Sequence, residues 1–157
     1  MADLEKQGKL KAIITQNIDG LHQKAGSLHV LELHGSIHRN FCMGCTHPYG
    51  LEDIIASETQ VPHCSVCGAM IKPDVVLYEE SLDQQILYQS IEAISRADLL
   101  IIGGTSLTVQ PAAHLVSYFQ GSRTVLLNAD ATPYDNQADL LISDRIGEVM
   151  EKVNSRL

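Results

Sequence analysis

The chain has 157 residues, a formal net charge of −8 and 45% hydrophobic residues. A chain of this length can bury a core and most simply forms one domain with a small appendage. The acidic charge argues against direct nucleic-acid binding, and no apolar run is long enough to cross a membrane. The N-terminus shows no apolar segment followed by a small-residue cleavage site, so we expect a cytoplasmic protein without a secretion signal.

The first part of the chain predicts two short strands separated by a helix. "KAIIT" (residues 11–15) is typical of a buried strand, and "IDGLHQKA" (18–25) of a short helix that Gly26 closes. "HVLEL" (29–33) predicts the second strand. A segment at 38–73 with two cysteine pairs follows and interrupts the alternation. We therefore expect an inserted module there.

Strands and helices alternate again after the cysteine segment. "DVVLY" (74–78) predicts a strand, and residues 81–97 predict a helix with Ser81 as its N-cap and Asp83 in its first turn. The remaining expected elements are a strand at 98–104, a helix at 111–119, strands at 124–128 and 139–142, and an amphipathic helix at 145–157. Such alternation indicates an α/β fold with a doubly wound parallel sheet.

The four cysteines form two Cys-x-x-Cys pairs with eighteen residues between them: Cys42, Cys45, Cys64 and Cys67. This spacing is typical of one tetrahedral Zn²⁺ site, in which each pair offers two thiolates. The alternatives are two disulfides or buried free thiols, and the absence of a secretion signal disfavours disulfides. Four protein ligands leave no open position, so the metal would be structural. His47 and His63 lie nearby and are expected to be bystanders.

Polar side chains follow four of the predicted strands. In doubly wound folds, ligands bind beyond the carboxyl ends of the strands, so polar residues at these ends can meet in one crevice. The Gly-Gly-Thr-Ser string by itself is weak evidence for a phosphate loop, because it lacks the full nucleotide-binding fingerprints. The strand-end residues are Gln16, Asn17, Asp19, His34, Thr105, Ser106 and Asn128.

Several motifs together resemble those of the sirtuins, the NAD-dependent protein lysine deacylases. They are "TQNIDGLH", "ELHGS", the two Cys-x-x-Cys pairs, "KPDVVLYEE", "GGTSLTVQPAA" and "VLLN", in family order and spacing from about residue 10 to 149. The resemblance implies a Rossmann-like domain with a small zinc-binding insertion and a cleft for NAD and an acylated peptide. We accordingly assign residues 1–37 and 74–157 to the Rossmann-like domain and 38–73 to the zinc-binding module.

The resemblance also implies roles for the residues around the reacting ribose. His34 resembles the general base that takes a proton from a ribose hydroxyl, as an imidazole can near neutral pH. Asn17 resembles the residue that orients this ribose and a bound water, and Gln16 matches a ribose contact. Asp19 resembles the carboxylate that holds the nicotinamide carboxamide. Asn17 and Asp19 also suit the cap of the following helix, and capping is compatible with cofactor contact.

Further contacts are implied for the other end of NAD and for the substrate. Val76 and Tyr78 correspond to the acyl-lysine tunnel, and the "VVLY" segment offers an edge on which a peptide can pair as a strand. Ser106 is alternatively only a turn or cap residue before Pro111. The residues matched to NAD contacts, chiefly in the adenosine half, are Gly104, Thr105, Ser106 and Asn128.

The chain departs from the sirtuin pattern in two places. Only fourteen residues precede Thr15, whereas sirtuins carry there a first Rossmann strand, a Gly-Ala-Gly-Ile-Ser loop and a Pro-Asp-Phe-Arg loop. We therefore expect a sheet incomplete at its N-terminus, weak NAD affinity, little deacylase activity of this chain alone, and self-association through an exposed sheet edge. Glu79 stands where the family usually has glycine, which puts the acyl-chain preference in question.

Two hypotheses follow. The first is NAD-dependent removal of acetyl or other acyl groups from protein lysines, releasing nicotinamide and O-acyl-ADP-ribose, with an acylated protein or peptide as partner. The second is a truncated, noncatalytic zinc-bearing module that binds a peptide or a partner chain. A zinc ribbon that binds nucleic acid is disfavoured by the acidic charge and by the scarcity of aromatic residues for base stacking, with two Phe and no Trp.

Overall fold

The computed structural model describes residues 1–156, and its parallel strands form two separate sheets. β1 (Ile13–Thr15) pairs with β2 (Val30–Glu32), and β6 (Leu99–Gly103), β7 (Arg123–Leu127) and β8 (Leu140–Ile142) pair in that order. The predicted α/β class with parallel strands is confirmed. The single sheet expected from the sequence is divided, because no backbone ladder joins β1 to β6 in the described part of the chain.

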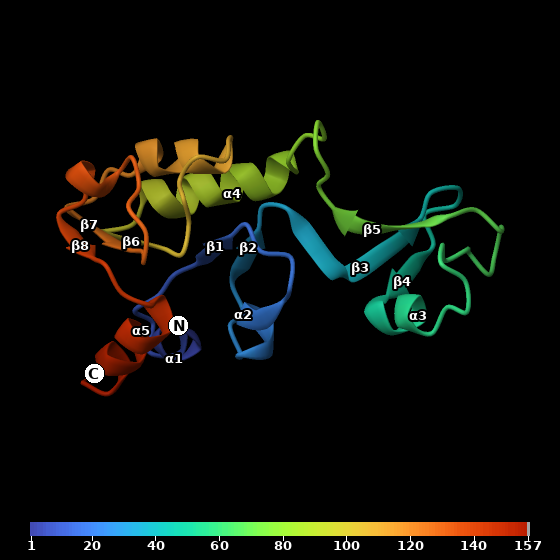
Figure 1. Cartoon of the computed structure of the whole chain (residues 1–157), viewed down its shortest axis with the longest axis horizontal. Helices are drawn as coiled ribbons and strands as arrows, with labels where there is room; N and C mark the ends of the chain where they lie inside the picture. Colours follow the sequence, from blue (N-terminus) through green and yellow to red (C-terminus); the bar gives the residue numbers. More distant parts are fainter. Residues whose placement is uncertain (157) are drawn as a thin grey trace.

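Helices cover both faces of the larger parallel sheet (Figure 1). α4 (Gln84–Ser95) and the 3₁₀ helix η1 (Ala112–Tyr118) lie on one face, and the short α1 (Ala2–Lys6) and α5 (Ile146–Asn154) on the other. None of the helices within residues 1–156 has the length and apolar character needed to cross a membrane. Buried residues of the first core are Leu33, Leu82, Ile94 and Leu115, and those of the second are Leu4, Leu127 and Met150.

The helix predicted at 81–97 is shorter than expected at its start. α4 begins at Gln84, and its N-cap is Asp83 rather than Ser81. The Asp83 Oδ1 accepts a hydrogen bond of 3.0 Å from the backbone N–H of Ile86. An acceptor at this position satisfies one of the free N–H groups of the first turn, and Ser81 lies too far from that turn to do so.

Other helix boundaries also differ from the sequence-based predictions. α2 (Leu21–Lys24) covers only the middle of the predicted helix at 18–25, because Gly20 takes a left-handed conformation with φ of +66°. η1 replaces the α-helix expected at 111–119, and α1 was not predicted. The helix predicted at 145–157 corresponds to α5, and its last predicted residue, Leu157, lies outside the described residues.

A three-stranded antiparallel sheet separates the two parallel sheets along the chain. It contains β4 (Pro48–Gly50), β3 (Gly35–Cys42) and β5 (Ile71–Val75) in that order, with α3 (Leu51–Ile55) packed against it. The strand predicted at 74–78 is only partly confirmed, because Asp74 and Val75 belong to β5, which ends there, and residues 76–78 lie outside it. β5 pairs antiparallel with β3. This sheet extends beyond 38–73 at both ends, and the division into two domains stays a prediction.

β1 and β6 are edge strands of the two parallel sheets, and each has its unpaired edge on the side that faces the other parallel sheet. Among residues 1–156, β6 forms a ladder only with β7, and β1 only with β2. None of the five residues of β6 is fully buried, and Leu99 is 49% exposed. An edge of this kind presents free N–H and C=O groups to any strand that can pair with it.

We predict that the isolated chain self-associates through the edge of β6, and that Leu99→Lys weakens the association by placing a charge there. Sedimentation of both proteins at several concentrations measures this. Leu28→Lys is the matched control, because Leu28 is 92% exposed and lies outside the strands. A wild-type chain that remains monomeric over the whole concentration range would contradict the prediction.

Candidate functional site

The four cysteine sulfurs converge at the far end of the antiparallel sheet. All four Sγ atoms lie within 4.8 Å of one another, and Cys42 and Cys64 are buried. Cys42 Sγ is 3.3 Å from Cys67 Sγ, and Cys45 Sγ is 3.6 Å from Cys64 Sγ. These distances are too long for disulfide bonds of about 2.05 Å, so the disulfide alternative is wrong. The sulfurs are arranged to bind one metal ion, and four thiolates are the ligand set of a structural zinc site.

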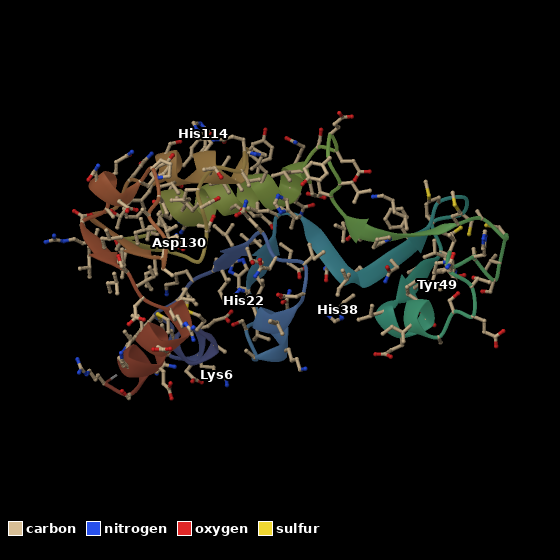
Figure 2. The ribbon with its side chains drawn as sticks, viewed as in Figure 1. Lys6, His22, His38, Tyr49, His114 and Asp130 are labelled. Atoms are coloured by element: carbon tan, nitrogen blue, oxygen red, sulfur yellow. The ribbon has the colours of Figure 1, made fainter. Side chains whose placement is uncertain are left out.

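Polar groups favour the ionised form of two of the four thiols, since the pKa is lowered for Cys42 and Cys64 and raised for Cys45 and Cys67. The hydroxyl of Tyr49 donates a hydrogen bond of 3.2 Å to Cys64 Sγ, and this bond lowers the pKa of the Cys64 thiol to about 5. The backbone N–H groups of Gly44 and Cys45 donate to Cys42 Sγ at 3.3 and 3.4 Å. Figure 2 shows Tyr49 at the end of the molecule where sulfur atoms gather. No sequence pattern had indicated Tyr49, since its role depends on β4 pairing with β3.

His34 lies at the carboxyl end of β2, half-buried, next to the carboxyl end of β1. Its Nδ1 is 3.0 Å from the main-chain oxygen of Gln16. A carbonyl oxygen can only accept, so Nδ1 carries the proton and donates it. In the neutral ring, Nε2 therefore holds the free lone pair and is the atom able to accept a proton. This tautomer suits a general base.

Gln16 also joins the ends of the two parallel sheets. The hydroxyl of Thr105, which follows β6, donates to Gln16 Oε1 at 3.2 Å. His34, Gln16 and Thr105 thus form one continuous group, although 89 residues separate Gln16 from Thr105. The expectation that strand-end polar residues meet is confirmed for these three.

The other strand-end residues are engaged more locally. Asp19 Oδ1 accepts from the backbone N–H of Leu21, the first residue of α2, at 3.0 Å, while the N-cap of this helix is Gly20. Asn17 is exposed, and its backbone N–H donates to Thr15 Oγ1 at 3.1 Å. Asp19 thus bonds to the first N–H group of α2 without being its N-cap residue, and the implied contacts of Asn17 and Asp19 with NAD stay proposals.

Three predicted residues follow β6 and β7. The Ser106 hydroxyl is exposed and lies 2.7 Å from Thr108 Oγ1, while Asn128 Nδ2 donates to the carbonyl of Asp130 at 2.9 Å. The backbone N–H of Gly104 donates to the Leu127 carbonyl at 3.0 Å, which places Gly104 beside the end of β7. These residues lie at the same edge of the parallel sheet as Thr105.

The two predicted substrate residues differ in their surroundings. Val76 packs against the first core, and its N–H donates to the carbonyl of His34 at 3.0 Å. Tyr78 is fully exposed and contributes no buried surface. The following residue, Glu79, has φ of +71°, in the left-handed region that glycine adopts without strain. The position where the resemblance expects glycine thus keeps the glycine-like conformation.

The backbone conformation and packing at position 35 explain why a glycine directly follows His34. It has φ of +76°, and an added Cβ would overlap the backbone carbonyl of Asp74. β3 and β5 approach each other there, with Gly35 paired to Val75. A side chain at this position would push the two strands apart.

Three charged residues next to this crossing were not identified from the sequence. The guanidinium of Arg39 donates to Glu32 Oε2 at 2.7 Å and to Asp74 Oδ2 at 2.9 Å. The side chain of Glu32 is only 7% exposed, and a buried carboxylate requires a charged partner. This group ties β2 to β3 and β5, and only the strand pairing brings its members together.

Comparison with known proteins identifies relatives over nearly the whole chain. The Sir2 family model matches residues 1–111. A protein of Clostridium acetobutylicum named NAD-dependent protein deacetylase is 62% identical over 153 residues, which are 98% of this chain and 62% of the relative. A protein of the same name from Staphylococcus aureus (strain N315) is 44% identical over 98% of this chain and 62% of its own length. The chain thus spans about three fifths of these curated relatives.

Solved structures show the same similarity. A structure described as Sir2 with a p53 peptide and NAD⁺ matches with a TM-score of 0.92 and 40% identity, over 99% of this chain and 66% of that chain. A second, described as Sir2Tm bound to a propionylated peptide, matches with a TM-score of 0.92 and 40% identity, over 99% of this chain and 67% of its own length.

We predict about one equivalent of zinc per chain, bound by the four cysteines. Removing it with a chelator should abolish the hydrogen-exchange protection of β3, β4 and β5, while β6–β8 and α4 stay protected, since metal binding and folding of such modules are coupled. His47→Ala should retain the metal, because the His47 ring packs edge-on against Tyr49 and is not part of the cysteine cluster, and its bond with Cys42 uses only the main chain. Elemental analysis finding less than about half an equivalent would contradict a four-thiolate zinc site.

We also predict that Gly35→Ala lowers the free energy of unfolding by at least about 2 kcal/mol, from left-handed strain together with overlap at Asp74. Gly8→Ala is the matched control, because Gly8 has φ of +71° and its added Cβ would meet nothing within 4 Å. Denaturant unfolding of the zinc-loaded proteins compares the two. Equal losses would show that the backbone crossing has no steric requirement for glycine.

Proposed function

The chain belongs to the Sir2 family, and from this premise we propose that it takes part in NAD-dependent removal of acyl groups from protein lysines, releasing nicotinamide and O-acyl-ADP-ribose. One observation carries the proposal: the Gln16 carbonyl fixes His34 with Nε2 as its basic atom, at the carboxyl ends of parallel strands. Such strand ends are where doubly wound folds bind nucleotides. The relatives named as NAD-dependent deacetylases support the same reaction.

The residues at this edge fit the hydroxyl-rich parts of NAD. Thr105 and Ser106 present hydroxyl groups, and Gln16 and Asn128 present amides, all of which can donate and accept hydrogen bonds. In this proposal, Gln16 and Asn17 contact the ribose next to nicotinamide, and Asp19 holds the carboxamide. Gly104, Thr105, Ser106 and Asn128 contact the adenosine half. When bound, NAD supplies the ribose carbon to which the acyl oxygen is transferred.

His34 acts in this proposal as the general base. Its Nε2 takes the proton of a ribose hydroxyl, while Nδ1–H remains bonded to the Gln16 carbonyl and spreads the positive charge that develops on the ring. The link from Gln16 to Thr105 holds this carbonyl in place. Proton transfer of this kind by a positioned side chain contributes about 10²–10⁴-fold to rate.

We propose an acylated lysine peptide as the substrate, bound along the segment that follows β5. The backbone N–H of Val76 donates a hydrogen bond to the carbonyl of His34. An acyl-lysine side chain packed on Val76 would therefore lie close to the proposed base. The exposed Tyr78 and Glu79 offer backbone groups for pairing with an extended peptide, whereas the N–H and C=O of Leu77 are bonded to Glu80. We place the protein in the cytoplasm. This is supported by the four cysteines, none of which forms a disulfide.

The experiment is an exchange with the Clostridium acetobutylicum relative. The chain replaces the matching residues of that deacetylase, and nicotinamide release from NAD and an acetyl-lysine peptide is measured. We predict an active chimera whose rate falls at least about a hundredfold on His34→Ala, the low end of what a general base contributes. Zinc content and thermal unfolding should not change.

His114→Ala is the matched control, because His114 is an exposed histidine on η1 whose ring contacts Tyr118 and Ser117 of the same helix. It should leave the rate unchanged. A folded, zinc-loaded chimera without activity would favour the noncatalytic peptide-binding or partner-binding module instead. A chimera in which His34→Ala has no effect would remove His34 from the reaction.

A further inference from the structure

The cysteine module contains a cavity that the proposed reaction does not use. It has a volume of about 290 Å³ and lies between α3 and the strands β3 and β5. None of its lining residues is a cysteine or a residue assigned above to NAD or to the acylated peptide. The lining residues are Ile37, Asn40, Leu51, Ile54, Pro62, Ile71 and Pro73.

Asn40 gives this cavity its polar character. The residue is only 5% exposed, and its Nδ2 donates to the carbonyl of Ile37 at 3.1 Å. Its Oδ1 has no hydrogen-bond donor among residues 1–156. This oxygen is not among the fully buried side-chain atoms that lack a partner, so it remains reachable from the cavity, and a hydroxyl or N–H group there can donate a hydrogen bond to it in place of water.

The size and lining of the cavity define the class of molecule it suits. No charged side chain is among the lining residues, which excludes ions because a buried unpaired charge is strongly disfavoured. The cavity is larger than apolar cavities of about 150 Å³ that bind benzene in another protein. It lies just below the roughly 300–1,000 Å³ of pockets for drug-sized ligands. One ring with a short substituent matches this volume.

We propose that the cavity is a binding site for a small uncharged ring compound bearing one hydroxyl or N–H group. The ring packs against Ile54 and Ile71, and the polar group donates a hydrogen bond to Asn40 Oδ1. Because the walls come from α3 and from two strands of the antiparallel sheet, the site requires a folded cysteine module. It is independent of NAD and of the acyl-lysine substrate.

The test titrates the zinc-loaded chain with phenol and separately with toluene, and follows the amide NMR spectrum of isotope-labelled protein. Phenol should bind saturably with a Kd of about 1 mM or tighter and shift the Asn40 side-chain amide signals. Toluene has nearly the same shape but no hydroxyl. In Asn40→Leu, the ratio of phenol affinity to toluene affinity should fall by about fivefold or more, because phenol loses one hydrogen bond that toluene never makes.

Two substitutions on α3 test the location. Ile54→Phe fills the cavity and should abolish binding of both probes. Ile55→Phe is the matched control, because Ile55 is the neighbouring residue, is 69% exposed and does not line the cavity. It should leave both affinities unchanged.

Wild-type titrations alone can overturn the proposal, whether or not the variants fold. The absence of saturable shifts with either probe, or shifts confined to residues outside the cavity, would refute the site. An unchanged affinity ratio in a zinc-loaded Asn40→Leu would refute the role of Asn40. Activity is not a readout, so these results do not depend on the proposed deacylation.

Discussion

The close approach of two backbone segments, at Gly35 and at Asp74–Val75, is the constraint on which the rest of the structure depends. The chain leaves the parallel strands at Gly35, forms the antiparallel sheet and the cysteine cluster, and returns at Val75, directly opposite its point of departure. The absence of a Cβ on Gly35 allows this contact. The cysteine module is thus attached through two adjacent strands, β3 and β5 (Figure 1). His34 and Val76, which share a backbone hydrogen bond, flank the attachment.

Charge reinforces the same junction. Glu32 is the last residue of β2, and its buried carboxylate is accommodated because Arg39 lies 2.7 Å away. The same guanidinium reaches Asp74 on β5, so one cation joins three strands. Exposed ion pairs contribute little to stability, but the burial of Glu32 makes this one a condition for the local arrangement. The geometry of His34, two residues after Glu32, follows from strands fixed in this way.

The two parallel sheets are held together by side chains rather than by a backbone ladder. Ile14 of β1 and Leu100 of β6 pack against the same core, which α4 and η1 cover. At the carboxyl ends, the hydrogen bond from Thr105 to Gln16 is the polar counterpart of this packing. The same Gln16 orients His34 through its carbonyl, so the packing of the two sheets and the tautomer of the histidine are physically linked.

The sequence by itself determined the features that depend on short spacing and periodicity. These are the two cysteine pairs, the apolar strands, the helix at α4, and the polar residues where strands end, because each depends on neighbours within a few residues. Only the tertiary structure decided that β5 runs antiparallel to β3 and that the parallel strands form two sheets. It also brought Tyr49 to the cysteines and Arg39 to Asp74, and left a cavity beside Asn40. Arg39 and Asp74 are 35 residues apart in sequence, and contacts over such separations depend on strand pairing and packing, for which the local sequence pattern carries no signal.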